Sequence, residues 1–526
     1  MKALRTGILM TMSVVALASE LFAAPAVQCG AQSGTQFNLE PATNAVAQQM
    51  ENVDFIPNRV GLNEDLVVAG AYDFRGNAPA GTTWDGSLSG YYVHRSTTPD
   101  CSPQFEGGLP PVTVQGKTFA GDGGTVIAAD PARDAFLVAD VRLDLTDQLS
   151  AIGLFRASSA NLLNPAQCPD GTHTAAQAQS CWEQTAPALI NQIPSSGPLS
   201  SLDYPSLAAD ERGSGLGAGD VYVAYGSFAA GMELVACNDA TLVCSSPLTI
   251  SDSTDPFGGT VDAHVEVRPD GIITVTYLDQ DSPPTDVIKF VSCKPAGAPN
   301  APICGAPAVV ATENQALGFS FSTGQSISGL NLLVLTFPKH ANRIEADGKT
   351  VTTFVVWDRC KTTFNFILPA GGSFPTCLDA DVVMSTSTDG ATWSPVTPVN
   401  GGPGHQFFPS ISTDESRGVV IITYYDASAD PFGKRLRVSL NHIDPGSTKV
   451  SPVIALTTLP TPWDADPSQN PFAIGFDFHF GMKARGMGTP GNSRLYTSFT
   501  STADRPGMYF GQPVREQNNN LVKLTY

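Results

Sequence analysis

Residues Phe408–Asp426 read FPSISTDESRGVVIITYYD, and this stretch decides the fold. It opens with a short alternating segment around Pro409 and Ser410, passes through a polar turn at residues 414–418, and ends in the apolar run Val419–Tyr425. Alternation, a turn and then a run of β-branched and aromatic residues predict two antiparallel strands, and not a helix.

The same two-strand sequence pattern recurs elsewhere in the chain. Tyr204–Gly226 reads YPSLAADERGSGLGAGDVYVAYG and has the same Pro-Ser opening, and His264–Asp279 reads HVEVRPDGIITVTYLD. The residues that close each second strand recur about every 50 to 90 positions, a spacing that fits about four short strands, or one propeller blade. These seven closing residues are Asp73, Asp140, Gly226, Asp279, Asp358, Asp426 and Thr500.

Further strands complete each copy. Third strands are expected at segments such as Met232–Asn238, and short fourth strands at segments such as Ala308–Thr312. Stacking small sheets around a ring covers both faces of each sheet, so we predict an all-β, seven-bladed β-propeller of four-stranded antiparallel blades, with six blades as the alternative. The last blade is expected to use residues 476–486, 494–500, 508–513 and 521–526. Asn314–Asp347 fits the pattern worst and is either a longer insertion or an inner strand of the fifth blade at Leu330–Phe337.

The N-terminus has the form of a secretory signal peptide. Residues 1–26 contain basic Lys2 and Arg5, an apolar run and small residues near the end, and no later apolar stretch is long enough to span a bilayer. We therefore expect a signal peptide at 1–26, an N-terminal extension at 27–50, a propeller at 51–526, and a secreted or periplasmic protein. A lipid anchor on Cys29 is disfavoured because Gln28 stands where a small residue is needed.

Ten cysteines in an exported chain are most simply explained by five disulfides. Their spacing favours local pairing, and a metal site is disfavoured because no Cys-x-x-Cys occurs. The expected pairs are Cys168 with Cys181, Cys237 with Cys244, Cys293 with Cys304, Cys360 with Cys377 and, by elimination, Cys29 with Cys101.

The formal charge is −20, from 49 acidic and 29 basic residues. Such a chain repels nucleic acid and anionic membrane surfaces, so we expect no nucleic-acid partner. We expect a monomer without a membrane span, for which a carbohydrate or cell-surface glycan is a possible partner.

Residues Ser385–Pro395 read STSTDGATWSP, where a third strand should turn into a fourth. Ser, Thr and Asp side chains can accept turn N–H groups, Gly390 permits an unusual backbone angle, and Trp393 can cover the blade edge. The segment resembles the Asp-box, or BNR repeat, of sialidases and related propellers, although it is one residue shorter between Ser and Trp. The resemblance implies a structural role on the outer rim, away from the active face.

Polar residues near the starts of the inner strands should converge on one face of the central channel. They are Asp122, Asp203, Tyr204, Asp262, His264, His405, Gln406, Asp477 and His479. The segment Phe476–Gly486 also resembles the Asp-aromatic-His-aromatic-Gly opening of the last blade in bacterial relatives.

Two functions are compatible with these residues. Asp203, Asp262, Asp477 and His479 could supply general acid/base catalysis on a glycan. Ligand contacts are assigned to Tyr204, His264, His405, Gln406, Arg268 and Arg485. No cofactor is expected, although carboxylates beside a histidine could instead hold a divalent cation. Polar groups can also bridge a channel only to satisfy backbone groups and water.

The resemblance does not extend to the sialidase substrate grip. Sialidases hold the substrate carboxylate with three arginines, one of them in an Arg-Ile-Pro motif, whereas this chain has Phe55-Ile56-Pro57. No triad can be assigned from Arg59, Arg75, Arg142, Arg268, Arg359 and Arg485. Two functions therefore remain open: a glycan-directed hydrolase acting at the channel mouth, and a non-catalytic carbohydrate- or protein-binding module.

Overall fold

The fold was analysed in a computed structural model. It describes residues 27–29, 48–61, 64–73, 88–95, 104–173, 175–182, 186–195, 201–252, 260–282, 285–313, 326–327, 332–333, 336–367, 373–430, 435–457, 461–462, 481–486, 493–501, 506–509, 512–515 and 518–526. The proposed signal peptide and the predicted site residues Asp477 and His479 lie outside these residues. Cys101, one half of the fifth predicted disulfide, also lies outside them.

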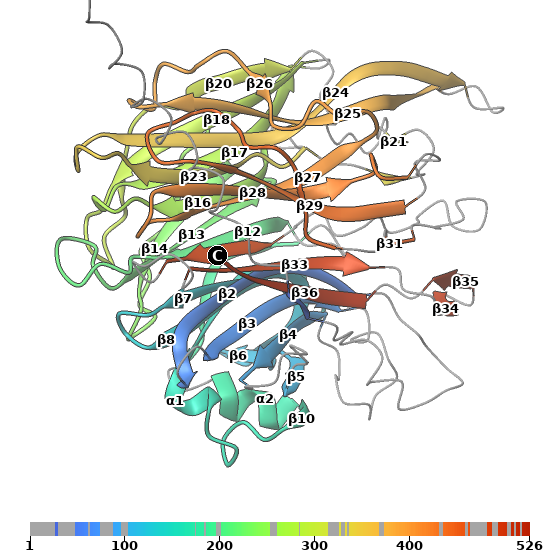
Figure 1. Ribbon diagram of the computed structural model, residues 1–526. Coiled ribbons are helices and arrows are strands. Elements are labelled where there is room, and N and C mark those ends of the chain that lie inside the picture. Colours follow the sequence, from blue (N-terminus) through green and yellow to red (C-terminus); the bar gives the residue numbers. More distant parts are fainter. Residues whose placement is uncertain are drawn as a thin grey trace, which may run out of the picture.

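Seven antiparallel sheets form seven blades, which confirms the predicted propeller (Figure 1). The inner strands are β2 (Gln48–Gly61), β7 (Lys117–Asp130), β12 (Leu202–Ala209), β16 (Thr260–Val267), β23 (Lys339–Ile344), β27 (Gln406–Asp414) and β32 (Met482–Arg485). The second strands are β3 (Glu64–Asp73), β8 (Ala135–Asp144), β13 (Asp220–Ser227), β17 (Ile273–Ser282), β24 (Val351–Ile367), β28 (Val419–Asp426) and β33 (Arg494–Ser501).

The outer half of each blade varies more than the inner half. The third strands are β4 (Ser89–His94), β9 (Leu149–Ser158), β14 (Gly231–Asn238), β18 (Thr285–Lys294), β25 (Ser373–Ser387), β29 (Arg435–Ile443) and β36 (Asn518–Thr525). The outer strands are β5 (Phe105–Gly108), β11 (Ala188–Pro194), β15 (Leu248–Thr249), β20 (Ala308–Glu313), β26 (Thr397–Pro398), β30 (Ile454–Ala455) and β1 (Val27–Cys29).

Short additional elements extend the blades. They are the strands β6 (Val112–Val114), β10 (Gly171–His173), β19 (Ile303–Cys304), β21 (Ser326–Ile327), β22 (Leu332–Leu333), β31 (Thr461–Pro462), β34 (Pro506–Tyr509) and β35 (Gln512–Arg515), and the helices α1 (Ser159–Leu162) and α2 (Ala175–Trp182). Both helices lie in the long connection from β9 to β11 in blade two, and β10 of the same connection pairs in parallel with β5 of blade one.

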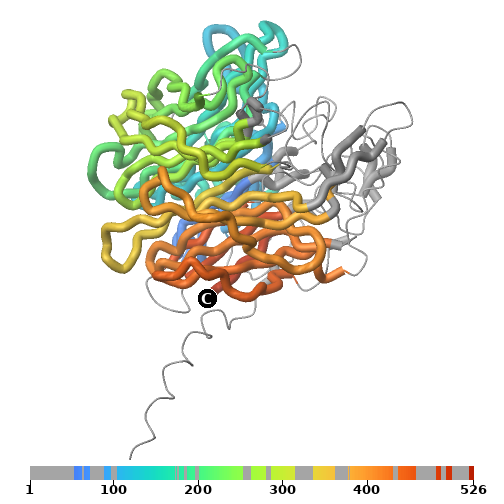
Figure 2. The backbone as a smooth tube through the Cα atoms, turned by 90° about the horizontal axis from the view of Figure 1, so that it is seen from above, coloured from blue at the N-terminus to red at the C-terminus, as the bar shows by residue number. Residues whose placement is uncertain are grey.

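The ring closes through the inner strands. Each inner strand contacts the inner strands of the two neighbouring blades, and β32 of blade seven contacts β2 of blade one. In Figure 1 the red strands β33 and β36 lie beside the blue strands β2 and β3, and Figure 2 shows the colours passing from blue through green and yellow to orange. Seven blades, and not six, therefore surround the axis.

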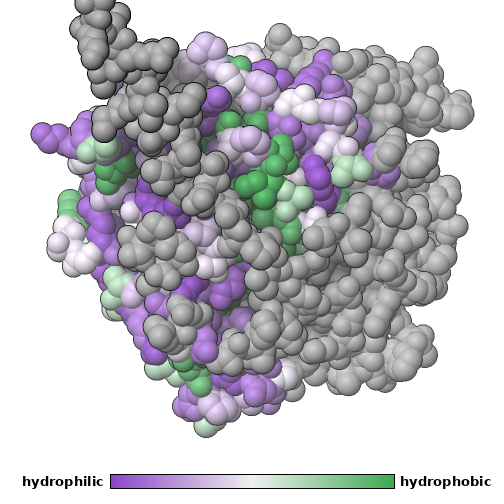
Figure 3. Space-filling model, in the orientation of Figure 1, coloured by the Kyte–Doolittle hydropathy of each residue, from purple (hydrophilic) through white to green (hydrophobic). Residues whose placement is uncertain are grey.

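Seven hydrophobic clusters fill the seven gaps between neighbouring blades. One contains Tyr425 of blade six and Leu495 of blade seven, and another contains Phe55 of blade one against Tyr496 of blade seven. The remaining five clusters occupy the other five gaps. Apolar side chains are thus removed from water by stacking, and the described surface in Figure 3 is mostly hydrophilic.

Two predicted strands were wrong. Residues 508–513 do not form the third strand of blade seven, because β34 and β35 pair with each other, while β36 pairs with β33. The outer strand of blade seven is β1, whose Val27 lies opposite Lys523 of β36. In blade five the inner strand is Lys339–Ile344, which pairs along its length with β24. Leu332 and Leu333, from the run Leu330–Phe337, pair with β21 instead.

Four of the five predicted disulfides are present, at 168–181, 237–244, 293–304 and 360–377. The bridges Cys237–Cys244 and Cys293–Cys304 join a third strand to the turn that follows it, and Cys168–Cys181 lies in the expanded connection of blade two. Such bridges are typical of proteins that fold in an oxidising compartment. No helix among the described residues is long and apolar enough to cross a membrane.

The turn at Ser385–Pro395 has the predicted backbone contacts. Asp389 Oδ1 accepts the backbone N–H groups of Ala391 at 2.8 Å and Thr392 at 2.7 Å, and Ser387 Oγ accepts that of Gly390 at 2.9 Å. Gly390 has φ of 71°. Trp393 packs edge-on against Phe290 of blade four, with 5.2 Å between ring centroids, so this turn fastens two neighbouring blades.

Candidate functional site

The inner strands are interrupted near their starts by a recurrent bulge. The strand register shifts after Asp203 in β12, after Val261 in β16 and after Phe407 in β27. Tyr204, Asp262 and Phe408 have φ of 48°, 48° and 51° at these bulges. Positive φ is unfavourable for residues other than glycine, so the packing of the ring holds these positions in strained conformations.

Two of the predicted carboxylates meet at this starting end of the channel. Asp122 on β7 and Asp203 on the neighbouring β12 interact electrostatically, and both side chains are half-buried. Burial, the Asp203 carboxylate and the Asp140 carboxylate together raise the pKa of Asp122 to about 7. A carboxyl group with this pKa is partly protonated at neutral pH and can donate a proton.

A buried ion pair lies behind Asp122. Arg142 Nη2 is 2.8 Å from Asp140 Oδ2, both side chains are fully buried, and the guanidinium lies over the ring of Phe155. Arg142 Nη1 also donates to the carbonyl oxygen of Pro110 at 2.8 Å. The Arg142 guanidinium is therefore held by protein groups within blade two.

The other predicted residues of the starting end have different surroundings. Tyr204 lies against Phe337, with 5.5 Å between ring centroids, so two aromatic rings adjoin the carboxylate pair. Asp262 and His405 are buried, and Gln406 donates to the carbonyl oxygen of Gly404 at 3.0 Å.

A cavity of about 400 Å³ lies at the opposite, closing end of the inner strands. Its wall comes from blades one, two, three, four, six and seven, including the turns that join first to second strands at Glu211, Pro269 and Glu415. Of the predicted residues, only His264 and Arg268 belong to this wall. The described cavity thus lies at the end of the channel away from the carboxylate pair.

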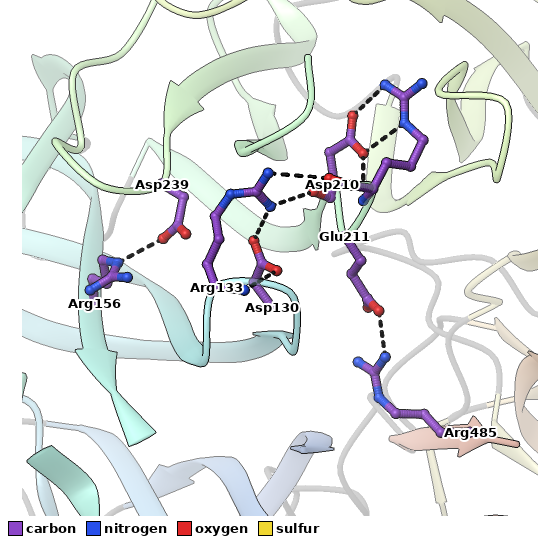
Figure 4. A network of polar contacts seen from close by, with 8 residues as sticks. Asp130, Arg133, Arg156, Asp210, Glu211, Asp239 and Arg485 are labelled. Carbon is purple, nitrogen blue, oxygen red and sulfur yellow. Dashed lines mark hydrogen bonds and ion pairs between the residues drawn. The ribbon is translucent and has the colours of Figure 1, made fainter. Parts of the chain in front are cut away.

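Arg485 of blade seven spans the channel at this closing end (Figure 4). Its Nη2 donates to Asp54 Oδ1 of blade one at 2.8 Å, and its Nη1 donates to Glu211 Oε2 of blade three at 2.6 Å. Burial alone would lower the pKa of Arg485, but the two carboxylates outweigh burial and raise it above its ordinary value. The guanidinium is therefore held by protein carboxylates.

Further polar contacts tie blade two to blade three beside this contact, among them the ion pair of Arg156 with Asp239 at 2.8 Å (Figure 4). Arg212 Nη2 lies 2.6 Å from Asp210 Oδ2. Arg133 pairs with Asp130 at 2.7 Å and also donates to the backbone oxygen of Asp210 at 3.0 Å. These contacts fix the turn after β12, which carries Glu211.

His264 and His340 form a neutral pair in the channel wall. The backbone N–H of His340 donates to Nδ1 of His264 at 3.2 Å, and His340 Nε2 lies 2.8 Å from the hydroxyl of Thr274. Burial lowers the pKa of His340 to about 3, and burial together with His340 lowers the pKa of His264 well below its ordinary value. Because His264 accepts at Nδ1, its proton is assigned to Nε2.

Three more ionisable side chains line the cavity. Burial raises the pKa of Glu266 to about 7, with Lys483 opposing the shift and nearby carboxylates adding to it. Burial would lower the pKa of Lys483, but Glu266 and Asp54 raise it more. Glu415 lies in the turn after β27 and is exposed.

The described arginines that could have formed a substrate grip are paired with carboxylates. The pairs are Arg59 with Asp134, Arg142 with Asp140, Arg268 with Asp270, Arg359 with Glu313, and Arg485 with Asp54. Arg75 lies outside the described residues. Within those residues, no group of three or more His, Cys, Asp or Glu side chains is arranged to hold a metal ion.

Most residues in the wall of the cavity at the closing end were not predicted from the sequence. Asp54, Glu211, Glu266, Glu415 and Lys483 were not predicted. One signal was present: in Glu266-Val267-Arg268 and Lys483-Ala484-Arg485 charged residues alternate with apolar ones, so two charges of each strand point to one face. Charges on the inner strand of a propeller face the channel.

No known sequence family and no curated protein matches this chain. Among solved structures, it is similar to a protein of unknown function from Dyadobacter fermentans, with 12% identity, a TM-score of 0.40, and coverage of 79% of this chain and 98% of the other. An α-L-arabinofuranosidase from Fusarium graminearum has 10% identity, a TM-score of 0.38, and coverage of 75% and 93%.

A sialidase from Trypanosoma rangeli has 9% identity, a TM-score of 0.36, and coverage of 76% of this chain and 54% of the other. Similarity of this degree says nothing about substrate or activity.

Proposed function

We propose that this chain is an exported propeller directed at glycans, with its site at the starting end of the channel. The observation that supports the proposal is the electrostatically coupled pair Asp122 and Asp203 on neighbouring inner strands. Pairs of carboxylates whose environments separate their pKa values are the usual machinery of glycoside hydrolysis.

The proposed roles follow from the surroundings of each residue. Asp122, with a pKa of about 7, would donate a proton to the glycosidic oxygen, and Asp203 would act as the nucleophile or as the base that activates water. Tyr204, which is partly exposed, would stack on a sugar ring, with the buried ring of Phe337 packed against it. Asp262, His405 and Gln406, with Asp477 and His479, remain proposed members of the site.

The proposed substrate is a neutral glycan. A sialic acid carries a carboxylate, which proteins grip with bidentate arginine, and the described candidate arginines are already paired. The aromatic pair Tyr204 and Phe337 also suits glycan binding without hydrolysis, which is the second candidate function.

The test uses the full-length protein on a glycan array, followed by hydrolysis assays with every glycan that binds. We expect Asp122→Asn and Asp203→Asn each to lower hydrolysis by at least a hundredfold while binding persists. Asp147→Asn, which changes an exposed carboxylate in the turn between β8 and β9, is the matched control and should leave both readouts unchanged.

The outcomes separate the two candidate functions. Binding that is lost in Tyr204→Ala, without any hydrolysis by the unaltered protein, would establish the binding module and reject the enzyme. If no glycan binds, or if the Asp203 variant hydrolyses at the full rate, the proposed site is wrong.

A further inference from the structure

The cavity at the closing end contains ionisable groups that no protein neighbour satisfies. Within the described part of the chain, no hydrogen bond or ion pair within 4.0 Å reaches Nζ of Lys483 or the carboxylates of Glu266 and Glu415. The arginines of the same wall, Arg212 and Arg268, both have carboxylate partners. The protein thus leaves one cation and two carboxyl groups facing a space of about 400 Å³.

The unpaired charges stand on different blades. Lys483 belongs to β32 of blade seven, Glu266 to β16 of blade four, and Glu415 to the turn after β27 of blade six. Blades seven and four face each other across a seven-bladed ring, so Lys483 and Glu266 interact across the cavity without direct contact. A molecule placed between them can reach both.

His264 adds a donor to the same wall. Its Nδ1 accepts the backbone N–H of His340, so the proton on Nε2 is available to a ligand in the cavity that His264 lines. Lys483 and His264 can therefore donate to an anionic group, while Glu266 and Glu415 can accept from a cationic one.

We infer that this cavity binds a small zwitterion of amino-acid size, whose carboxylate contacts Lys483 and His264 and whose ammonium group contacts Glu266 and Glu415. A dianion would leave both carboxylates unpaired, and a dication would leave Lys483 unpaired, and an unpaired charge on the partly buried Glu266 or Lys483 is unfavourable. The volume fits a small-molecule site. The inference does not depend on the proposed glycan site, which uses other residues at the other end of the channel.

Titration of Glu266 makes the affinity pH-dependent. Glu266 has a pKa of about 7, and the ionised form accepts from the ligand ammonium group. The other charged or titratable groups of the same wall are Lys483, Arg212, Arg268, His264, Asp54, Asp210, Glu211 and Glu415. Burial raises the pKa of Glu415 as well, so its ionisation acts in the same direction, and binding should strengthen between pH 6 and pH 8 as Glu266 loses its proton.

The test is titration calorimetry of the full chain with glycine, L-alanine and L-serine. Malonate, 1,3-diaminopropane and glycerol serve as dianionic, dicationic and neutral probes of similar size. We expect the zwitterions to bind at least tenfold more tightly than the other three. Lys483→Met should weaken glycine binding at least tenfold, and Glu266→Gln should weaken it severalfold and reduce the pH dependence. Lys349→Met, on an exposed turn, is the matched control.

Glu415→Gln tests the inference even if the Lys483 or Glu266 variant fails to fold, because Glu415 is an exposed turn residue. This variant should weaken glycine binding while its melting temperature stays unchanged. The inference is overturned if none of the three amino acids binds at millimolar concentration, or if malonate or diaminopropane binds as tightly. Unchanged affinity in both Lys483→Met and Glu415→Gln also overturns it.

Discussion

Arg485 on blade seven and Glu211 on blade three, which are separated by 274 positions in the chain, meet across the central axis with 2.6 Å between Nη1 and Oε2. Asp54 on blade one binds the other side of the same guanidinium and also accepts the backbone N–H of Ala129 on blade two at 2.9 Å. Four blades are therefore connected through one arginine and its two carboxylates.

The two partners of Arg485 should differ in their contribution to stability. Asp54 is 4% exposed, whereas the Glu211 side chain is 36% exposed. Removing one partner of a buried pair typically costs about 3–5 kcal/mol, and an exposed pair contributes about 0–1 kcal/mol. Asp54→Ala should therefore lower the urea midpoint far more than Glu211→Ala does. Equal effects would show that the guanidinium is solvated at both contacts.

Asp122 should make the protein less stable as the pH rises. Its pKa is about 7 in the folded protein against 3.8 ordinarily, so the folded state resists ionisation and stability falls between pH 4 and pH 7. Asp122→Asn removes this cost. With partial solvation of the side chain, we expect a gain of roughly 1–3 kcal/mol at pH 8. Thermal melts should show no gain at pH 4, and a gain of equal size at both pH values would contradict the argument.

The bridge between Cys237 and Cys244 should stabilise blade three through its short loop. The cysteines are 7 residues apart, and the chain-entropy model gives about 2 kcal/mol for a loop of this size. The double variant Cys237→Ala/Cys244→Ala should unfold at a lower urea concentration by this amount. Glycan and glycine binding should not change, because the bridge lies in the outer half of the blade.

Gly390 should not tolerate a side chain. It has φ of 71°, and an added Cβ would lie 2.9 Å from a ring carbon of Phe290. Gly390→Ala should therefore cost about 1–2 kcal/mol through backbone strain, and more if Phe290 cannot move. Asp389→Ala, which removes the acceptor of two turn N–H groups, should also lower the melting temperature. Neither change should affect ligand binding, since an effect there would place the Asp-box near a site.

Local patterns predicted most of the architecture. The run Val419–Tyr425 pairs with the strand before it as expected, and six further closing residues marked the other blades correctly. These signals act over a few residues, because alternation and turn chemistry are local properties. The membership of β1 in blade seven depends on a partner almost 500 residues away, as Val27 and Lys523 show, and no local pattern encodes it.

The candidate site was harder to predict for a related reason. Asp122 and Asp203 were found because both lie near the start of an inner strand, a position that the repeat reveals. Lys483 and Glu266 can be recognised as members of one site only because they face each other across the ring. That placement depends on the number of blades. Arg268 and Arg485 were expected to bind a ligand, but the structure places Asp270 against the first and Asp54 and Glu211 against the second.

The pairing of Val27–Cys29 with Leu521–Lys523 also bears on how the chain matures. Synthesis from the N-terminus produces β1 long before its partner, so β1 would wait unpaired until β36 had been made. Blade seven can gain its outer strand only after Leu521–Lys523 has been synthesised. Premature termination would leave an open arc, with the apolar flank of blade one exposed to proteases.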